Sequence, residues 1–422
     1  MPDNNIKTIT FGCRLNLYES EIIDSINDNE NIIVFNTCSV TKEAERQARQ
    51  VIRKTKKNHP DKAIVVTGCA AQTNPKAFEE MPEVDLVIGN EMKTQKETYQ
   101  EIPQMLQQKQ KVFTTDIMQK TTEEIDFMIT SFEDRTRAFV QIQNGCNHRC
   151  TFCIIPYGRG NSRSVKSSTI IEQIRALQQN GYNEVILTGV DTTSYGQDLK
   201  EEICLGELCE KILQETSIPR LRLSSIDVAE IDDTLFNVIT KNRRFMPHLH
   251  ISLQSGNNLT LKQMKRRHTR EEVIDFCKKV RDIRPNIAFG SDIIAGFPTE
   301  TPAMFEETSQ LLEHCNIVFN HIFSFSAREG TPAAKMKQLP KEIVKARTKR
   351  LINESNLRLE KFLREKVDHT YSAIIEKGNC GRLEDFTAIE IIDSEPQEGS
   401  IVNVRIQGLS SNNKALLATV CQ

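Results

Sequence analysis

Short apolar runs alternate with longer amphipathic stretches along the first hundred residues. The runs predict strands of a buried sheet, because they are continuously apolar and too short for helices; they are IKTITF, NIIVFNT, AIVVTG and VDLVIGN. The stretch KEAERQARQVIRKTKKN has the periodicity of a charged amphipathic helix that ends near Pro60. This alternation predicts an open α/β domain with a parallel sheet over residues 4–115. Polar, weakly patterned sequence near its end suggests a linker over residues 95–131.

A second alternating region spans residues 132–362. Six apolar runs predict its strands: AFVQIQ, EVILTG, RLRLSS, HLHISL, IAFGSDIIAGF and NHIFSFS. Helical patterns separate them, and one, SSTIIEQIRALQQNG, is expected to start at a serine cap and end at Gly181. Six strand–helix units predict a barrel or partial (β/α)6 barrel, with chemistry on the loops that follow the strands. A long helix, KEIVKARTKRLINESNLRLEKFLREK, closes the region.

The last sixty residues change character. Residues 363–422 contain short strand patterns broken by Gly, Asn and Ser, such as GSIVNVRIQGLS and ALLATV. This pattern predicts a small β-barrel of the OB type, which commonly binds nucleic acid.

Composition narrows the class of protein. The 422 residues are 38% hydrophobic and 27% charged, with a formal net charge of −2, so the chain is an ordinary globular protein without a uniformly basic surface. The N-terminus has no apolar run long enough for a signal peptide or a membrane span, so we expect a cytoplasmic protein with no membrane partner. Three basic runs, RKTKKNHPDK, KRRHTR and KARTKR, are either phosphate contacts or solvated helix faces.

Twelve cysteines fall into two sets. Cys13, Cys38 and Cys69 each come just after a predicted strand, and the carboxyl ends of parallel strands share one edge of a sheet. We therefore expect these three thiols to converge. Six others are interpreted as small packed residues in helices and strands: Cys204, Cys209, Cys277, Cys315, Cys380 and Cys421.

Cys146, Cys150 and Cys153 lie close together in QNGCNHRCTFCIIPYGRG, just after the first strand of the predicted barrel. Their spacing lets three thiolates converge on one metal centre. A zinc ion normally takes a fourth protein ligand, for which His148 is available. An iron–sulfur cluster held by three cysteines leaves one iron open.

The loop, with Phe152 before its last cysteine, resembles the radical SAM superfamily. That resemblance implies a [4Fe–4S] cluster on Cys146, Cys150 and Cys153 that binds S-adenosylmethionine (SAM) and splits it to a 5′-deoxyadenosyl radical. The motifs FGCRLNLYES, NTCSVTKEAERQAR, TGCAAQ, LTGVDTTSYG, HISLQSGNNLTLKQMKRRHTREE and DIIAGFPTET are similar to the methylthiotransferase family. The end of the chain resembles that family's RNA-gripping TRAM domain.

The resemblance implies further cofactors and partners. A second [4Fe–4S] cluster is expected on Cys13, Cys38 and Cys69, carrying the sulfur that a separate SAM methylates. SAM thus serves as radical source and as methyl donor. The reaction also needs a sulfur source and an electron donor such as flavodoxin or ferredoxin.

Other residues are candidates for cofactor contacts. Phe152 is expected beside the SAM adenine. Five more are expected near SAM or the substrate: Gly189, Asp191, Ser225, Gln254 and Asp292. Alternatively, these five residues have structural roles, in an ordinary turn or in hydrogen bonding within the barrel. Gly296 is expected to shape the cofactor pocket. Arg159 and Arg163 are either phosphate contacts or part of a solvated surface loop.

The tail of FGCRLNLYES is closest to the branch that methylthiolates carbon 2 of N6-threonylcarbamoyladenosine beside the tRNA anticodon, giving 2-methylthio-N6-threonylcarbamoyladenosine. Isopentenyladenosine tRNA and a ribosomal-protein aspartate are alternative substrates within the family. A second hypothesis is that the protein is not an enzyme but an RNA-binding protein with structural zinc.

Overall fold

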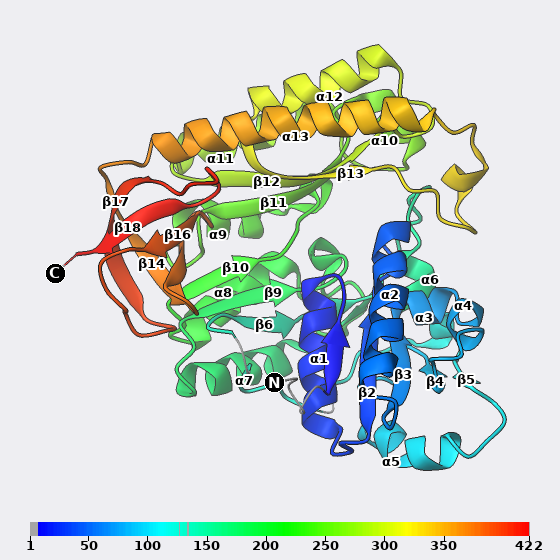
Figure 1. The fold of residues 1–422 in the computed structure, drawn as a ribbon. Helices are drawn as coiled ribbons and strands as arrows, with labels where there is room; N and C mark the ends of the chain where they lie inside the picture. The colour runs from blue at the N-terminus through cyan, green and yellow to red at the C-terminus, as the bar shows by residue number, and fades with distance from the viewer. Residues whose placement is uncertain (1–6, 126, 133–134, 422) are drawn as a thin grey trace.

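The computed structural model describes residues 7–125, 127–132 and 135–421. Three sheet systems follow one another along the chain (Figure 1). An open sheet at the N-terminus is followed by a partial barrel and then by a small closed barrel at the C-terminus. This confirms the predicted α/β fold class.

The N-terminal sheet is parallel and five-stranded, in the order β1-β2-β3-β4-β5. Its strands are β1 (Thr8–Thr10), β2 (Ile32–Thr37), β3 (Ala63–Gly68), β4 (Leu86–Ile88) and β5 (Val112–Phe113). The helices are α1 (Arg14–Ile26), α2 (Lys42–Asn58), α3 (Cys69–Thr73), α4 (Lys76–Glu79) and α5 (Lys96–Met105). The four predicted strands and the charged helix are thus present.

The linker expected over residues 95–131 is wrong in its first half. Residues 96–105 form α5, and residues 112–113 add β5 to the sheet edge. Tyr99, Ile102 and Met105 recur at helical spacing and are buried against the core. These three residues form only a narrow apolar stripe. Because polar residues fill the positions between them, the segment as a whole has the polar composition of a linker.

The partial barrel contains all six predicted strands. They are β6 (Ala138–Gln141), β9 (Glu184–Thr188), β10 (Arg220–Leu223), β11 (His248–Gln254), β12 (Ala288–Ala295) and β13 (Ile317–Ser324). Strands β6, β9 and β10 form one parallel sheet, and β11, β12 and β13 form another. Isolated bridges join Leu221 to Phe245 and Ile226 to Ile251, so the two sheets continue into one curved wall.

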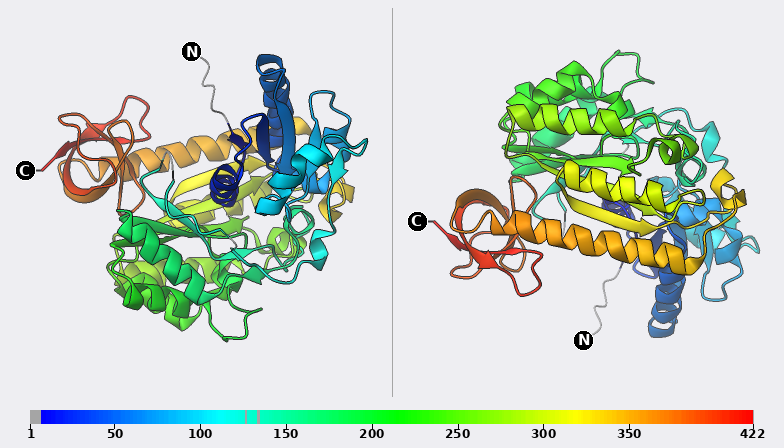
Figure 2. Two further views of the ribbon diagram at one scale, coloured as in Figure 1. Left: turned by 90° about the horizontal axis from the view of Figure 1, so that it is seen from below. Right: turned by 90° about the horizontal axis from the view of Figure 1, so that it is seen from above.

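Helices cover the outside of this wall (Figure 2). They are α7 (Ser167–Gln179), α8 (Leu205–Glu215), α9 (Asp233–Lys241), α11 (Arg270–Ile283), α12 (Pro302–His314) and α13 (Lys341–Arg364). The serine cap predicted for α7 is wrong. Lys166 occupies the cap position, while the Ser167 hydroxyl donates to Glu201 Oε2 at 2.7 Å. The Ser167 hydroxyl therefore binds the carboxylate of Glu201, which is distant in sequence, and does not cap the helix.

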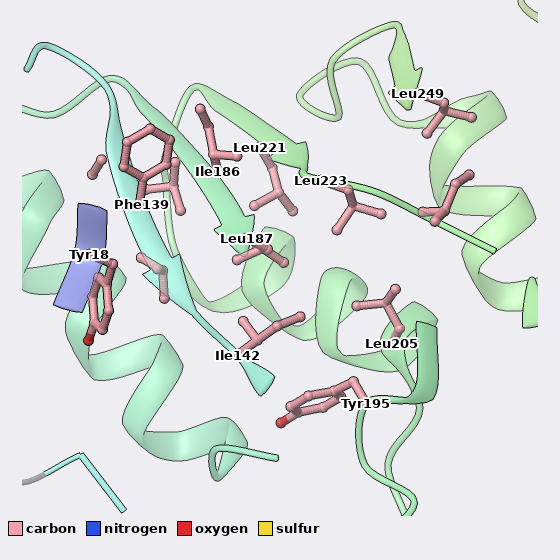
Figure 3. Packing of buried hydrophobic residues seen from close by; sticks show 14 of the residues in the cluster. Tyr18, Phe139, Ile142, Ile186, Leu187, Tyr195, Leu205, Leu221, Leu223 and Leu249 are labelled. Atoms are coloured by element: carbon pink, nitrogen blue, oxygen red, sulfur yellow. The ribbon is translucent and has the colours of Figure 1, made fainter. Parts of the chain in front are cut away.

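The N-terminal sheet and the barrel share one hydrophobic core. Figure 3 shows Tyr18 of α1 and Phe139 of β6 on one side of this core, with Ile186 and Leu187 of β9 next to them. Because apolar surface from both parts is removed from water together, the N-terminal sheet is held firmly against the barrel.

The C-terminal barrel is closed by five strands in the order β14-β15-β16-β18-β17. They are β14 (Thr370–Glu376), β15 (Cys380–Leu383), β16 (Ala388–Ile391), β17 (Ile401–Leu409) and β18 (Leu416–Val420). Its core is separate from that of the barrel, except that Leu363 of α13 packs into it. The predicted small β-barrel is therefore confirmed.

Phe386 fastens this small barrel to the larger one. Its ring stacks on His248, the first residue of β11, with ring centroids 4.7 Å apart. The guanidinium groups of Arg137, Arg222 and Arg382 lie 4.9–5.4 Å from the Phe386 ring centroid. The contact is at the amino ends of the barrel strands. In Figures 1 and 2 the C-terminal barrel and the N-terminal sheet lie at opposite ends of α13.

The described helices include none that is both long and apolar enough to cross a membrane.

Candidate active site

The three N-terminal cysteines lie where the sheet pattern predicts. Cys13 stands at the cap of α1, Cys38 follows β2 and Cys69 follows β3. Burial and the neighbouring Cys69 and Cys13 thiols raise the pKa of Cys38 to about 12. Thiols that influence one another in this way share one end of the sheet, as expected from the strand order.

A glycine keeps the turn before Cys13 close to Cys38. Gly12 has φ +98°, and a Cβ built there lies 2.6 Å from Cys38 Cβ and 2.7 Å from its Sγ. Both the backbone conformation and the close approach require glycine at this position.

The second cysteine triad lies on the loop between β7 (Gln143–Asn144) and α6 (Ile155–Arg159). The Cys146 N–H donates to the Gly160 carbonyl at 3.1 Å, and the Cys153 N–H donates to the Cys150 carbonyl at 3.1 Å. Burial raises the pKa of Cys153 to about 12, and the nearby Cys150 adds to the shift. These thiols need a positive partner to be held as thiolates, which a metal centre supplies.

Cysteines from both triads line one cavity, which has a volume of about 620 Å³. Cys13 and Cys38 line it from the N-terminal sheet, and Cys153 with Phe152 lines it from the barrel. A cavity of this size accommodates a nucleoside-sized ligand.

The spacing of the thiols is wider than the coordination of a single zinc ion by all three sulfurs requires. Tetrahedral Zn–S bonds of about 2.3 Å place sulfur ligands only about 3.8 Å apart. Among the described residues, neither triad brings its three Sγ atoms within 4.8 Å of one another. A four-iron cluster is wider than a single ion, so its ligands stand further apart.

His148 does not complete a zinc site with the three cysteines. Its Nε2 lies 2.9 Å from Asp191 Oδ2 and 3.5 Å from Glu230 Oε2. Hydrogen bonds to these two carboxylates raise the pKa of His148 to about 9. A protonated imidazole is not a metal ligand, so the pair of carboxylates holds His148 as a cation beside Cys146.

Five of the candidate cofactor residues line the cavity: Phe152, Gly189, Ser225, Gln254 and Asp292. Gly189 directly follows β9, and Gln254 is the last residue of β11. Asp292 lies inside β12, three residues before its end.

Two candidates are absent from the lining. The Asp191 carboxylate faces His148 and lies 3.5 Å from Cys146 Sγ. Gly296, at φ +79°, packs against Val344 of α13, so it seats that helix instead of shaping the cavity.

Sequence reasoning missed two histidines that bracket Asp292. His250 Nε2 and His321 Nδ1 each lie 3.1 Å from Asp292 Oδ1. All three line the cavity. Both histidines lie in predicted strands, and their alternation with apolar neighbours, as in HLHISL, was the signal available.

The expectations for Arg159 and Arg163 are both wrong, because these side chains are buried. Arg159 makes a bidentate contact with Glu19 of α1, with two N···O distances of 2.8 Å. Arg163 Nε donates to Glu123 at 2.9 Å. Arg159 therefore ties the loop after the second triad to the helix that starts at Cys13.

In two of the basic runs, one arginine is engaged inside the protein. In KRRHTR, Arg266 donates to Asp227 Oδ2 at 2.8 Å and contacts Cys150 Sγ at 3.8 Å. In KARTKR, Arg347 donates to Glu300 at 2.7 Å and is buried. These arginines are neither phosphate contacts nor solvated.

Comparison with known families agrees with this arrangement. The model of the radical SAM superfamily matches residues 140–312, and that of the uncharacterized protein family UPF0004 matches residues 5–89. Among solved structures, the radical SAM methyltransferase TsrM from Kitasatospora setae covers 72% of this chain and 64% of its own. Its TM-score is 0.54 at 13% identity, a similarity of fold alone.

Curated relatives align over nearly the whole chain. The threonylcarbamoyladenosine tRNA methylthiotransferase MtaB of Rickettsia prowazekii (strain Madrid E) is 47% identical, covering 96% of each protein. MtaB of Bacillus subtilis (strain 168) is 34% identical over 94% of this chain and 92% of its own. The tRNA-2-methylthio-N(6)-dimethylallyladenosine synthase of Staphylococcus haemolyticus (strain JCSC1435) is 32% identical over 94% and 81%. The chain therefore belongs to the radical SAM tRNA methylthiotransferase family, which uses [4Fe–4S] clusters and SAM.

Proposed function

We propose that this enzyme replaces the hydrogen on carbon 2 of N6-threonylcarbamoyladenosine, next to the tRNA anticodon, with a methylthio group. The product is 2-methylthio-N6-threonylcarbamoyladenosine. The observation that carries the proposal is one cavity lined by cysteines from both triads, which belong to two domains. The substrate follows from relatives at 47% and 34% identity, which are named for threonylcarbamoyladenosine.

Each triad has its own task in this proposal. Cys146, Cys150 and Cys153 hold the cluster that binds SAM, and Cys13, Cys38 and Cys69 hold the cluster that carries sulfur. When bound, the clusters and SAM supply the one-electron chemistry and the methylthio group that no acid or base can provide at an unactivated C–H bond.

In this proposal, the side chains around the cavity bind and orient SAM. Phe152 offers a flat apolar face to the adenine of SAM, and Gly189 permits a close backbone approach. Ser225, Gln254 and Asp292 offer hydrogen-bonding groups to the ribose or to the amino group of SAM. Arg266 places a positive charge beside Cys150, with its guanidinium 3.8 Å from Cys150 Sγ.

Asp191 acts indirectly. Its carboxylate orients His148 beside Cys146, which makes it a positioning residue for the cluster loop instead of a direct ligand of SAM.

The remaining partners belong to the same proposal. A flavodoxin or ferredoxin supplies electrons, and a separate sulfur source replenishes the transferred atom. The C-terminal barrel, over residues 363–422, grips the RNA. The reaction takes place in the cytoplasm, on the anticodon stem-loop.

Mass spectrometry of tRNA nucleosides from cells with and without the gene tests the function. We expect the deletion to remove 2-methylthio-N6-threonylcarbamoyladenosine and to accumulate its precursor without the methylthio group. Expression of the intact gene restores the product, whereas a Cys150→Ala variant does not. Loss of the methylthiolated isopentenyl nucleoside instead would assign the enzyme to the other tRNA branch.

A further inference from the structure

One corner of the cavity is closed by parts of two domains. Five residues line it: Val40, Thr41 and Ala44 at the start of α2, and Ser326 and Arg328 after β13. Arg328 forms an ion pair with Glu45 of α2 across this junction. The corner therefore exists only when the N-terminal sheet and the barrel are together.

Arg328 is a buried cation, and one of its hydrogen-bond donors has no acceptor. Its side chain is 9% exposed, and Glu45 contacts Nη2. The Nε atom is buried and has no hydrogen-bond partner. Because a buried donor without an acceptor is costly, this one is suited to an acceptor that arrives with a ligand.

The surroundings favour a negatively charged acceptor. Among the described residues that line the cavity, Asp292 is the one carboxylate, and His250 and His321 already contact it. Thr41 caps the start of α2, where the helix dipole is positive. Arg14 also lines the cavity, but its guanidinium lies over the Phe386 ring, 5.6 Å from the centroid.

The chemistry of the proposed substrate supplies such an acceptor. In adenine, carbon 2 and carbon 6 flank the same ring nitrogen, so a substituent on N6 lies beside the reacting carbon. The threonylcarbamoyl group ends in a carboxylate, whereas the isopentenyl group is a hydrocarbon.

We propose that Arg328 binds the carboxylate of the N6 substituent through Nε and thereby selects anionic over hydrocarbon-substituted adenosines. This inference rests on the proposed function, since it concerns the substrate of the same cavity. A site built to pair a polar group rejects an analogue that lacks the group, because its own donor is then left buried and unpaired.

A second role for Arg328 has to be separated from this one. Arg328 and Cys38 line the same cavity, so the guanidinium is also placed to stabilise an anionic cluster on the N-terminal triad. That role affects the iron content and every RNA alike, whereas substrate selection affects only RNAs that carry the carboxylate.

A double-mutant cycle between protein and RNA tests the proposal. Anaerobically purified holoenzyme is titrated, without SAM, with labelled anticodon stem-loops in a fluorescence anisotropy assay. The modified base carries threonylcarbamoyl, its neutral carboxamide analogue, or isopentenyl. Phosphate contacts are common to the three RNAs, so affinity ratios isolate the N6 group.

We expect wild type to bind the carboxylate RNA about 10- to 100-fold more tightly than the carboxamide RNA. The ratio falls to about one in Arg328→Met. Arg328→Lys retains a positive charge facing Glu45 but lacks Nε, and it loses most of the preference. Arg46→Met, an exposed arginine on the same helix, retains the wild-type ratio.

Equal affinity of wild type for the carboxylate and carboxamide RNAs would overturn the inference without any variant. So would an unchanged ratio in Arg328→Met, or a loss of iron and sulfide in that variant with uniformly weaker binding of all three RNAs. Failure of the proposed function is seen separately: wild type supplied with SAM and reductant would then methylthiolate the isopentenyl RNA and leave the threonylcarbamoyl RNA unchanged.

Discussion

At the scale of single residues, the cysteine sites depend on the small residues beside them. Gly12 allows the chain to turn beside Cys38, and Gly158 lets α6 pass over Cys69, where a built Cβ lies 3.3 Å from Cys69 Cβ. Such positions have no tolerance for extra atoms, because the thiols must keep their places relative to one another.

Gly12→Ala is expected to remove the N-terminal cluster and leave the other intact. The added methyl group meets Cys38, and the positive φ adds strain. Anaerobically purified Gly12→Ala should hold about half the iron of wild type, cleave SAM and form no methylthiolated RNA. Gly181→Ala is the control, since Gly181 also has positive φ but its Cβ meets nothing within 4 Å. Full iron content in Gly12→Ala would contradict this account.

Cysteines and arginines differ in how well their positions can be predicted from the sequence. The cysteines of the two triads lie where the sequence predicts, because position relative to a strand is a local property of the chain. Of the six cysteines expected to be packed, Cys209, Cys277 and Cys315 are buried. That expectation is wrong for Cys380 and Cys421, which are exposed, and Cys204 is half-buried.

Arg159 and Arg328 were misjudged or missed, because their partners Glu19 and Glu45 are 140 and 283 residues away. No local pattern indicates whether an arginine is solvated or buried against such a partner.

At the scale of elements, apolar runs located every long strand, and the misses were of short ones. Strand β15 has the sequence CGRL and β5 has two residues, so neither offers a run of alternating or continuous apolar positions. Both are strands because neighbours supply hydrogen bonds to them, which is a tertiary effect.

The amino ends of β6, β9 and β10 are held by a buried ionic network. Glu184, the first residue of β9, lies 3.0 Å from Arg222 and 3.5 Å from Arg137. Burial disfavours its charged form, but Arg222 and Arg137 outweigh burial and lower the pKa of Glu184 to about 2.

This network predicts a pH-dependent contribution to stability. Because the folded pKa of Glu184 lies below its ordinary value of 4.5, the stabilisation is present above pH 4.5 and is lost as the pH falls towards 2. Glu184→Gln should lower the free energy of unfolding by about 3–5 kcal/mol at pH 7, with a smaller difference from wild type at pH 3. Urea unfolding at both pH values measures the difference in the free energy of unfolding. Glu210→Gln is the control, because Glu210 is exposed on α8. A difference independent of pH would exclude the network as its cause.

At the scale of the whole molecule, the C-terminal barrel is joined to the partial barrel by aromatic contacts of Phe386 and by polar contacts such as the ion pair of Arg137 with Glu376, at 2.7 Å. The N-terminal sheet and barrel share a core, whereas the C-terminal barrel has its own. Phe386 connects the two, with its backbone at φ +75° and its ring between His248 and arginine side chains.

Phe386→Ala is expected to loosen the C-terminal barrel without unfolding it. Truncating a fully buried aromatic costs about 3–5 kcal/mol. Phe386 is half-buried, so we expect a smaller loss, and it falls on the contact between domains. Small-angle X-ray scattering should show a larger radius of gyration, and the KM for tRNA should rise more than kcat falls. Leu357→Ala on α13 is the control, because Leu357 is 68% exposed. An unchanged radius and KM would show that other contacts hold the barrel in place.

The position of that contact has a consequence for how RNA binding reaches the cavity. The C-terminal barrel docks at the amino ends of the barrel strands, and Arg14, which lines the cavity, lies over the Phe386 ring of this contact, 5.6 Å from its centroid. The domain that is proposed to grip the RNA is therefore one side chain away from the cavity. A shift of the C-terminal barrel on binding RNA is expected to displace a residue of the cavity wall.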